Sequence, residues 1–194
     1  MAVGDSKTES PGSNGGGQGG GTDWEVLLLG LLNATGTHTW TEVRGAHRRV
    51  AYGGYTMGQL LAAAPAVLDT VTAPAPDYIL VNLGANDLTA SPSPTTETDF
   101  KQAMSDLIDL LRSYYPNASI WFAKPWIRSH DSDSFTMGTW IAAVAASKNV
   151  NVGINENVWL KGADNGVTNT YDGIHYSGAG ETACAAQWKA VLGL

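Results

Sequence analysis

Short, almost wholly apolar runs alternate along this chain with longer segments whose apolar residues recur every three or four positions. The clearest apolar runs cover residues 77–83, 119–123 and 150–154. Such runs are typical of parallel strands that are buried on both faces. Parallel strands separated by helices form a sheet that is covered on both sides. We therefore predict the α/β class, as a three-layer αβα sandwich around a central, mostly parallel sheet.

The remaining elements are expected from local signals. Further extended segments are expected at residues 1–3 and 47–52, which gives a five-stranded sheet. Helices are expected to begin at Thr22 or Asp23, at Thr56 and at Thr95 or Thr96, and to cover residues 140–147 and 180–192. Thr and Asp side chains favour helix starts because their oxygens accept hydrogen bonds from the first backbone N–H groups. The sequence shows no internal repeat and no change of composition, so we predict one domain over residues 1–194.

A glycine-rich stretch covers residues 11–22 and contains seven glycines. Such a composition predicts a flexible loop, because glycine has high chain entropy and no side chain to pack. A phosphate-binding loop is the alternative interpretation. It is disfavoured because no Gly-Lys-Ser/Thr follows the glycines.

Charge and hydropathy narrow the possible partners. Eighteen acidic residues against eleven Lys and Arg give a net charge of −7, which disfavours binding to nucleic acid or anionic lipid. The longest apolar run, residues 26–32, is far shorter than the ~20 residues that span a bilayer. We therefore expect no nucleic-acid partner, no transmembrane segment and, because no basic start precedes that run, no signal peptide in this chain. A soluble protein is expected; secretion, excision from a longer precursor and the oligomeric state stay open.

The cysteine and acidic residues give no sign of a metal centre. Cys184 is the single cysteine of the chain and stands among alanines, which predicts a buried, inert thiol. Asp131 and Asp133 could together bind a cation, but a lone pair of carboxylates without further ligands is a poor site. We expect neither a metal nor a cofactor.

Polar residues follow the apolar runs at four places. These blocks are Gly4-Asp5-Ser6, Gly53-Gly54-Tyr55-Thr56, Gly84-Ala85-Asn86-Asp87 and Tyr171–Ser177. Taken singly, each block is consistent with a turn or a helix cap. The carboxyl ends of parallel strands meet at one edge of a sheet, however, where such folds bind ligands. Together the blocks supply a serine, a histidine, an aspartate and several hydrogen-bond donors, which is the set that acyl transfer requires.

In this order, the blocks resemble the signature of the SGNH, or GDSL-type, hydrolase/esterase family. The matching residues are Gly4-Asp5-Ser6, Gly54, Gly84-Ala85-Asn86-Asp87 and Asp172-Gly173-Ile174-His175. The resemblance extends over residues 4–175. It implies a flavodoxin-like αβα fold and ester hydrolysis by a serine nucleophile.

The resemblance and the chemistry assign the same roles to three residues. Ser6 is expected to be the nucleophile and His175 the base that activates it. Asp172 is expected to accept the second imidazole N–H and to stabilise the imidazolium. Asp172 precedes His175 by three residues, so the loop must turn tightly, which Gly173 permits.

The oxyanion hole is expected from the family pattern. The resemblance implies the backbone N–H groups of Ser6 and Gly54 and the side-chain amide of Asn86. Gly53 stays open as an alternative to Gly54, because the sequence reads Tyr52-Gly53-Gly54-Tyr55.

Three charged neighbours of these blocks require separate interpretation. Asp5 and Asp87 could form a carboxylate pair for acid–base chemistry, but the resemblance implies that both bind backbone and are structural. Lys7 is expected to be solvated, with attraction of anionic acyl groups as the alternative.

The sequence restricts the substrate less than the reaction. Trp24, Trp40, Trp126 and Trp159 are expected to pack in the core, with stacking on sugar rings as the alternative. The favoured function is hydrolysis of short- to medium-chain acyl esters, above all acetyl esters, on small molecules or glycans. A lipid-directed esterase, lysophospholipase or thioesterase is the alternative within the family. A carbohydrate-binding module without turnover is the non-enzymatic one.

Overall fold

The computed structural model describes residues 1–9, 23–34, 49–70, 75–91 and 93–194. Its centre is a sheet of five strands, all parallel, in the order β2-β1-β3-β4-β5. The strands are β1 (Ala2–Gly4), β2 (Arg49–Ala51), β3 (Tyr78–Asn82), β4 (Ser119–Lys124) and β5 (Asn151–Asn155). The predicted parallel sheet is confirmed, and β1 lies inside it although it has only three residues.

The strand order places the end of β1 at a special position. Val3 of β1 pairs with Val50 of β2 on one side and with Val81 of β3 on the other. The chain therefore runs outward from β1 to β2 and then returns across the sheet to β3. Such a reversal opens a crevice beyond the carboxyl ends of the strands, which is where open parallel sheets bind ligands.

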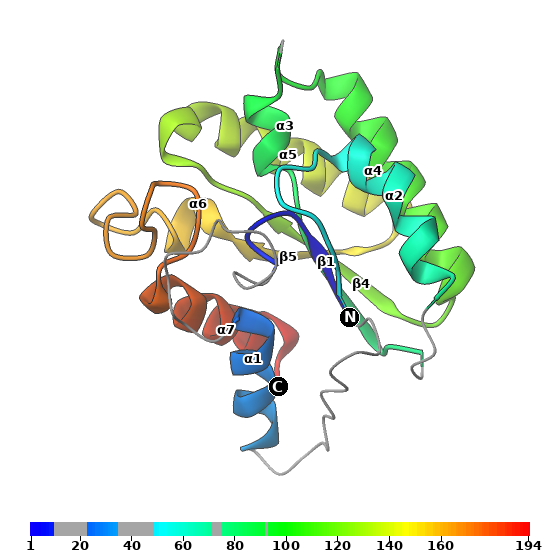
Figure 1. The fold of residues 1–194 in the computed structure, drawn as a ribbon, viewed down its shortest axis with the longest axis horizontal. Coiled ribbons are helices and arrows are strands. Elements are labelled where there is room, and N and C mark those ends of the chain that lie inside the picture. Colours follow the sequence, from blue (N-terminus) through cyan, green and yellow to red (C-terminus); the bar gives the residue numbers. More distant parts are fainter. Residues whose placement is uncertain (10–22, 35–48, 71–74, 92) are drawn as a thin grey trace.

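Helices cover both faces of the sheet. They are α1 (Trp24–Asn33), α2 (Met57–Leu68), α3 (Ala85–Thr89), α4 (Glu97–Tyr114), the 3₁₀ turn η1 (Arg128–His130), α5 (Asp131–Lys148), α6 (Glu156–Trp159) and α7 (Gly178–Leu192). Figure 1 shows α2, α4 and α5 on one face, and α1 and α7 side by side on the other. The three-layer αβα sandwich is thus confirmed.

Each face of the sheet has its own buried core. Under α2 and α4 the core is mostly aliphatic, and Leu60, Phe100 and Leu107 are fully buried there. Under α1 and α7 the core is aromatic, and the rings of Trp24 and Trp188 stack with centroids 5.9 Å apart.

Helix starts predicted from capping residues agree with the structure. Thr56 Oγ1 accepts a hydrogen bond from the Gln59 backbone N–H (3.3 Å), and Gln59 Oε1 accepts one from the Thr56 N–H (2.9 Å). This reciprocal arrangement satisfies two backbone donors that would otherwise lack partners. Thr96 caps α4 because its hydroxyl oxygen accepts the Asp99 N–H (3.2 Å), and Asp23 precedes α1.

Other helix boundaries differ from the prediction. Helix α5 begins at Asp131, nine residues before the expected start at residue 140. Its first turns carry mostly polar side chains, so they lack the apolar spacing that predicts a helix, although Ser134 and Met137 are buried. The short helices α3 and α6 were not predicted, and α7 begins at Gly178 rather than at residue 180.

Some predictions lie outside the described residues. These concern the glycine-rich loop of residues 11–22, Trp40, and the start of the extended segment at residues 47–48. Among the helices that the structure describes, none has both the length and the apolar character that crossing a bilayer requires.

Candidate active site

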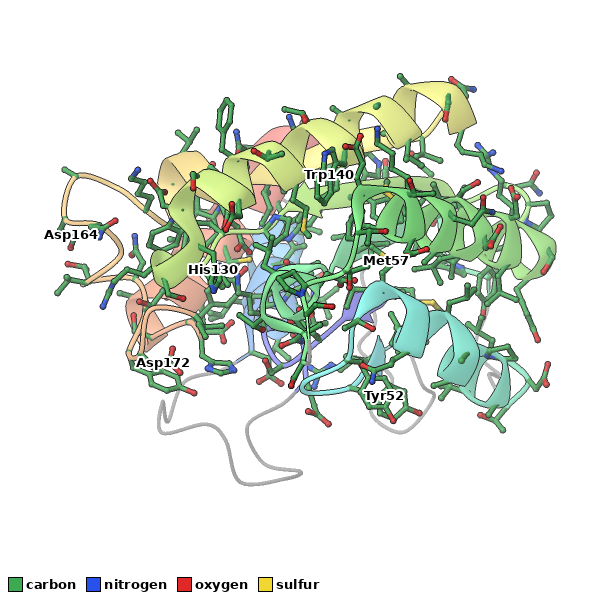
Figure 2. The ribbon with its side chains drawn as sticks, turned by 90° about the horizontal axis from the view of Figure 1, so that it is seen from above. Tyr52, Met57, His130, Trp140, Asp164 and Asp172 are labelled. Atoms are coloured by element: carbon green, nitrogen blue, oxygen red, sulfur yellow. The ribbon has the colours of Figure 1, made fainter. Side chains whose placement is uncertain are left out.

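All four sequence blocks lie beyond carboxyl ends of the central strands. Asp5 and Ser6 directly follow β1, residues 53–54 follow β2, and residues 84–87 follow β3. The fourth block, residues 171–177, forms the loop that leads into α7. Figure 2 shows two of these loops toward the same side of the molecule, where Tyr52 and Asp172 are labelled.

Ser6, His175 and Asp172 are joined by hydrogen bonds. Ser6 Oγ lies 2.8 Å from His175 Nε2, and Asp172 Oδ2 lies 2.6 Å from His175 Nδ1. The second oxygen, Asp172 Oδ1, accepts the backbone N–H groups of Ile174 and His175, both at 2.8 Å. Gly173 adopts φ +92°, the left-handed region that the tight turn requires. The structure therefore brings a hydroxyl, an imidazole and a carboxylate into one continuous chain of hydrogen bonds.

The surroundings of Asp172 favour its charged form. Partial burial raises the pKa of this carboxyl, but the hydrogen bonds from the His175 ring and from the His175 and Ile174 backbone N–H groups outweigh burial, and the pKa is lowered. Asp172 therefore stays negative at neutral pH. The Tyr171 ring stacks on the His175 ring with centroids 5.6 Å apart and 13° between the planes.

The turn that presents Ser6 depends on a glycine at the end of β1. A Cβ on Gly4 would lie 2.3 Å from Thr8 Oγ1 and 2.5 Å from the Asn82 carbonyl oxygen. Only glycine allows this close approach of two backbones. The Asp5 carbonyl then accepts the N–H groups of Thr8 (2.9 Å) and Glu9 (2.8 Å), which closes the turn around Ser6.

Two of the expected oxyanion donors, Gly54 and Asn86, lie in the loop after β2 and in helix α3 after β3. Asn86 Nδ2 donates to the Tyr55 carbonyl oxygen at 3.0 Å, which connects α3 to the loop after β2. Gly54 has φ +80°, and Gly53 donates its backbone N–H to Glu9 Oε2 at 2.6 Å. The carboxylate of Glu9 thus occupies the Gly53 N–H, which favours Gly54 as the backbone donor.

Asp5 and Asp87 both bind backbone N–H groups. Asp5 Oδ1 accepts the Lys7 N–H at 3.0 Å, and Asp87 Oδ2 accepts the Met57 N–H at 2.9 Å. Burial raises the pKa of each carboxyl to about 6, against the lowering effects of Lys7 on Asp5 and of the Met57 N–H on Asp87. These contacts agree with the structural roles that the resemblance implies.

The prediction for Lys7 is wrong. Its side chain is 0% exposed and pairs with the equally buried Glu156, with Lys7 Nζ 2.5 Å from Glu156 Oε2. Lys7 Nζ also donates to the Trp126 carbonyl oxygen at 2.9 Å. The turn after β1 directs the Lys7 side chain into the interior. There the Glu156 carboxylate and the Trp126 carbonyl take the place of water around the ammonium group.

Three polar residues near the site were missed by sequence reasoning. Asn82, Glu156 and Tyr176 are buried and hydrogen-bonded to one another. Asn82 carried a usable signal, because it is a polar residue inside an apolar strand run. Glu156 gave none, since an acidic residue after a strand is usually exposed.

The remaining candidates are accounted for by packing and ion pairs. Trp24 and Trp126 are 1% and 0% exposed, which confirms the core interpretation and excludes sugar stacking for both. Trp159 is partly buried against the same core. Cys184 is fully buried, as predicted, and burial raises the pKa of its thiol.

The two aspartates considered for a cation have protein partners. Asp131 accepts hydrogen bonds from Lys161 Nζ (2.6 Å) and Trp126 Nε1 (2.7 Å), while Asp133 lies 3.2 Å from His130 Nδ1. Over the part of the chain that the structure describes, no group of three or more His, Cys, Asp or Glu side chains is arranged to hold a metal ion.

Comparison with solved structures identifies proteins of the same fold. An acetyl xylan esterase from Geobacillus stearothermophilus aligns with TM-score 0.72 at 20% identity, covering 99% of this chain and 93% of that one. The family 3 carbohydrate esterase from Clostridium thermocellum aligns with TM-score 0.70 at 21% identity, covering 98% and 92%. TesA aligns with TM-score 0.71 at 21% identity, covering 98% and 96%. At these identities the likeness shows a shared fold.

The family assignment rests on the sequence itself. A search of curated proteins gave no match. The model of the GDSL-like Lipase/Acylhydrolase family, in contrast, matches residues 2–183, which include all four blocks. The resemblance noted in the sequence is therefore confirmed: this chain belongs to the GDSL-like lipase/acylhydrolase family of carboxylic ester hydrolases.

Proposed function

We propose that this protein is a serine esterase that removes short- to medium-chain acyl groups, above all acetyl, from small molecules or carbohydrates. The observation that carries the proposal is the continuous chain of hydrogen bonds from Ser6 Oγ through His175 to Asp172, with contacts of 2.8 and 2.6 Å. A hydroxyl is a weak nucleophile at neutral pH, and a base within hydrogen-bond reach removes that barrier.

The proposed reaction proceeds through an acyl-enzyme. His175 Nε2 takes the proton of Ser6 Oγ while this oxygen attacks the ester carbonyl carbon, and Asp172 stabilises the resulting imidazolium. The negative oxygen of the tetrahedral intermediate is held by the N–H groups of Ser6 and Gly54 and by Asn86 Nδ2. His175 then gives its proton to the departing alcohol. Water, activated by the same imidazole, attacks the acyl-enzyme and releases the acid.

Aromatic rings beside the site support a carbohydrate ester as the substrate. Tyr171, which stacks on His175, is 42% exposed. Tyr52 and Tyr55, both partly buried, stack on each other with centroids 4.9 Å apart on the loop that follows β2. Exposed aromatic faces bind the flat apolar faces of sugars, and two of the structurally similar proteins are named for acetyl xylan and carbohydrate esters.

A substrate series with active-site variants tests the proposal. We expect the wild type to hydrolyse p-nitrophenyl acetate faster than the butyrate or laurate ester. Ser6→Ala should lower kcat at least ~10³-fold, as loss of the nucleophile does in serine hydrolases. Ser113→Ala serves as the matched control, because Ser113 is exposed on α4 and its hydroxyl only donates to the Leu110 carbonyl.

Each other result points to a different function. A rate maximum at laurate would replace the proposal by the lipid-directed esterase or thioesterase. An unchanged rate in Ser6→Ala would contradict the serine mechanism. Binding of acetylated glycans without release of acetate or p-nitrophenol would identify a binding module without turnover.

A further inference from the structure

A charged pair lies fully buried directly beneath the site. Lys7 and Glu156 have side chains that are 0% exposed, and they are 2.5 Å apart. Removing two charges from water is costly, and apolar residues of similar volume often fill such a space without loss of stability. Stability alone therefore does not account for the pair.

Glu156 binds groups from several segments at the carboxyl ends of the strands. Its Oε2 accepts Lys7 Nζ and the Trp126 backbone N–H (2.9 Å), while its Oε1 accepts Asn82 Nδ2 (3.0 Å) and the Tyr176 hydroxyl. Asn82 Nδ2 also donates to the Tyr176 oxygen at 2.6 Å. One carboxylate thus binds the turn after β1, the end of β3, the segment after β4 and the loop before α7.

Two of these four partners are chain neighbours of the reacting groups. Lys7 follows Ser6, and Tyr176 follows His175. Ser6 and His175 are 169 positions apart in the sequence, so the chain itself does little to hold their contact. Lys7 and Tyr176, the next residues along the chain, are equally far apart in the sequence, and Glu156 joins them. This connection lies in the dry interior, where hydrogen bonds are stronger.

We propose that Lys7, Glu156 and Tyr176 are positioning residues, whose buried connection holds Ser6 Oγ against His175 Nε2. The inference rests on the proposed function for its kinetic consequence, but its geometric content is independent of turnover. The connection fixes the turn that carries the nucleophile relative to the loop that carries the base. Reacting groups displaced by about 1 Å lose on the order of 100-fold in rate.

Tyr176→Phe is the first variant to measure. It keeps the ring in the core but removes the hydroxyl that reaches Glu156. We expect kcat for p-nitrophenyl acetate to fall roughly 10- to 100-fold, with KM within about twofold of the wild type, because the acyl and alcohol contacts are not changed. Leu107→Ala and Ile141→Val are controls in the core on the other side of the sheet. One should lower the thermal midpoint more than Tyr176→Phe does and the other less, and both should keep the wild-type kcat.

A double variant separates positioning from folding. In Lys7→Met/Glu156→Gln both charges of the pair are removed together, so the thermal midpoint should lie well above that of Lys7→Met. We expect kcat to remain low, because the turn after β1 is no longer tied to Tyr176. A wild-type kcat in the folded double variant, or in folded Tyr176→Phe, overturns the proposal.

Crystal structures test the geometry without any substrate. In Tyr176→Phe we expect the Ser6 Oγ to His175 Nε2 distance to exceed hydrogen-bond reach, roughly 3.2 Å, whereas Leu107→Ala should keep it. An unchanged distance in Tyr176→Phe overturns the positioning role. If the wild type hydrolyses no ester, the proposed function fails, and this distance still decides whether the buried connection positions the two side chains.

Discussion

Two regions of the molecule bury charge in opposite ways. Beneath the site, Glu156 meets four donors, one of them the cation of Lys7. Between α1, β2 and α7, Asp23, Glu25 and Glu181 gather around Arg49. In the first region the carboxylate has a cation of its own, and each of its two oxygens accepts two hydrogen bonds. The second has more negative than positive groups among its described residues.

The acidic cluster has direct consequences for protonation. Arg49 pairs with Asp23 (2.9 Å) and Glu25 (2.7 Å), while Glu181 Oε2 accepts the Trp24 backbone N–H at 2.8 Å. Burial raises the pKa of Glu25 to about 7, with Arg49 opposing this, and raises that of Glu181 to about 8, with Glu25 and Asp23 adding to the rise. The two regions differ in how their buried carboxylates are surrounded: Glu156 has a cation and three further donors of its own, whereas Glu25 and Glu181 share one arginine with Asp23.

Removing the buried cation beneath the site should have the largest effect on the free energy of unfolding. We expect Lys7→Met to lower the free energy of unfolding by about 3–5 kcal/mol, because Glu156 is left buried without its cation. Urea unfolding at pH 7 measures this. Lys7→Met/Glu156→Gln should recover most of the loss. A single variant as stable as the wild type would mean that Glu156 does not depend on Lys7 for charge compensation.

Removing one carboxylate from the acidic cluster should raise the free energy of unfolding at high pH, by less than Lys7→Met lowers it. A raised folded-state pKa means that the folded protein binds the proton more tightly than the unfolded chain, so wild-type stability falls as pH rises from about 4.5 to about 8. Glu181→Gln keeps an acceptor for Trp24 and removes this dependence. We expect the variant to be more stable than the wild type at pH 9 by about 2 kcal/mol, and not at pH 5.

Thermal melts across this pH range test the effect of Glu181. Asp106→Asn, on the exposed side of α4, is the control and should run parallel to the wild type. Parallel curves for Glu181→Gln and the wild type would show that Glu181 is ionised in the folded protein with no penalty.

An exposed ion pair should have the smallest effect. Lys148 Nζ lies 2.6 Å from Asp109 Oδ2 at the surface between α4 and α5. We expect Lys148→Met to change the free energy of unfolding by less than about 1 kcal/mol, because water solvates both charges in the folded and unfolded states. A loss as large as that of Lys7→Met would remove the distinction between buried and exposed pairs.

Local features of the fold were predictable, and contacts between distant residues were not. The starts of α2 and α4 follow from Thr56 and Thr96, whose partners lie three residues away. The burial of Lys7 depends on Glu156, 149 positions further along the chain, and no local pattern indicates it. The four blocks of the site were predictable because the carboxyl ends of parallel strands must share one edge.

Asp172 and His175 lie within one tetrapeptide that is bonded to itself. Motion of this loop therefore carries the imidazole and its carboxylate together, and their contact survives. The link that such motion breaks is the one to Ser6, which belongs to the centre of the sheet, and it breaks once Tyr176 has left its buried contact with Glu156. Heat inactivation of this protein would then report the detachment of a surface loop, while the circular dichroism of the sandwich is still that of the native state.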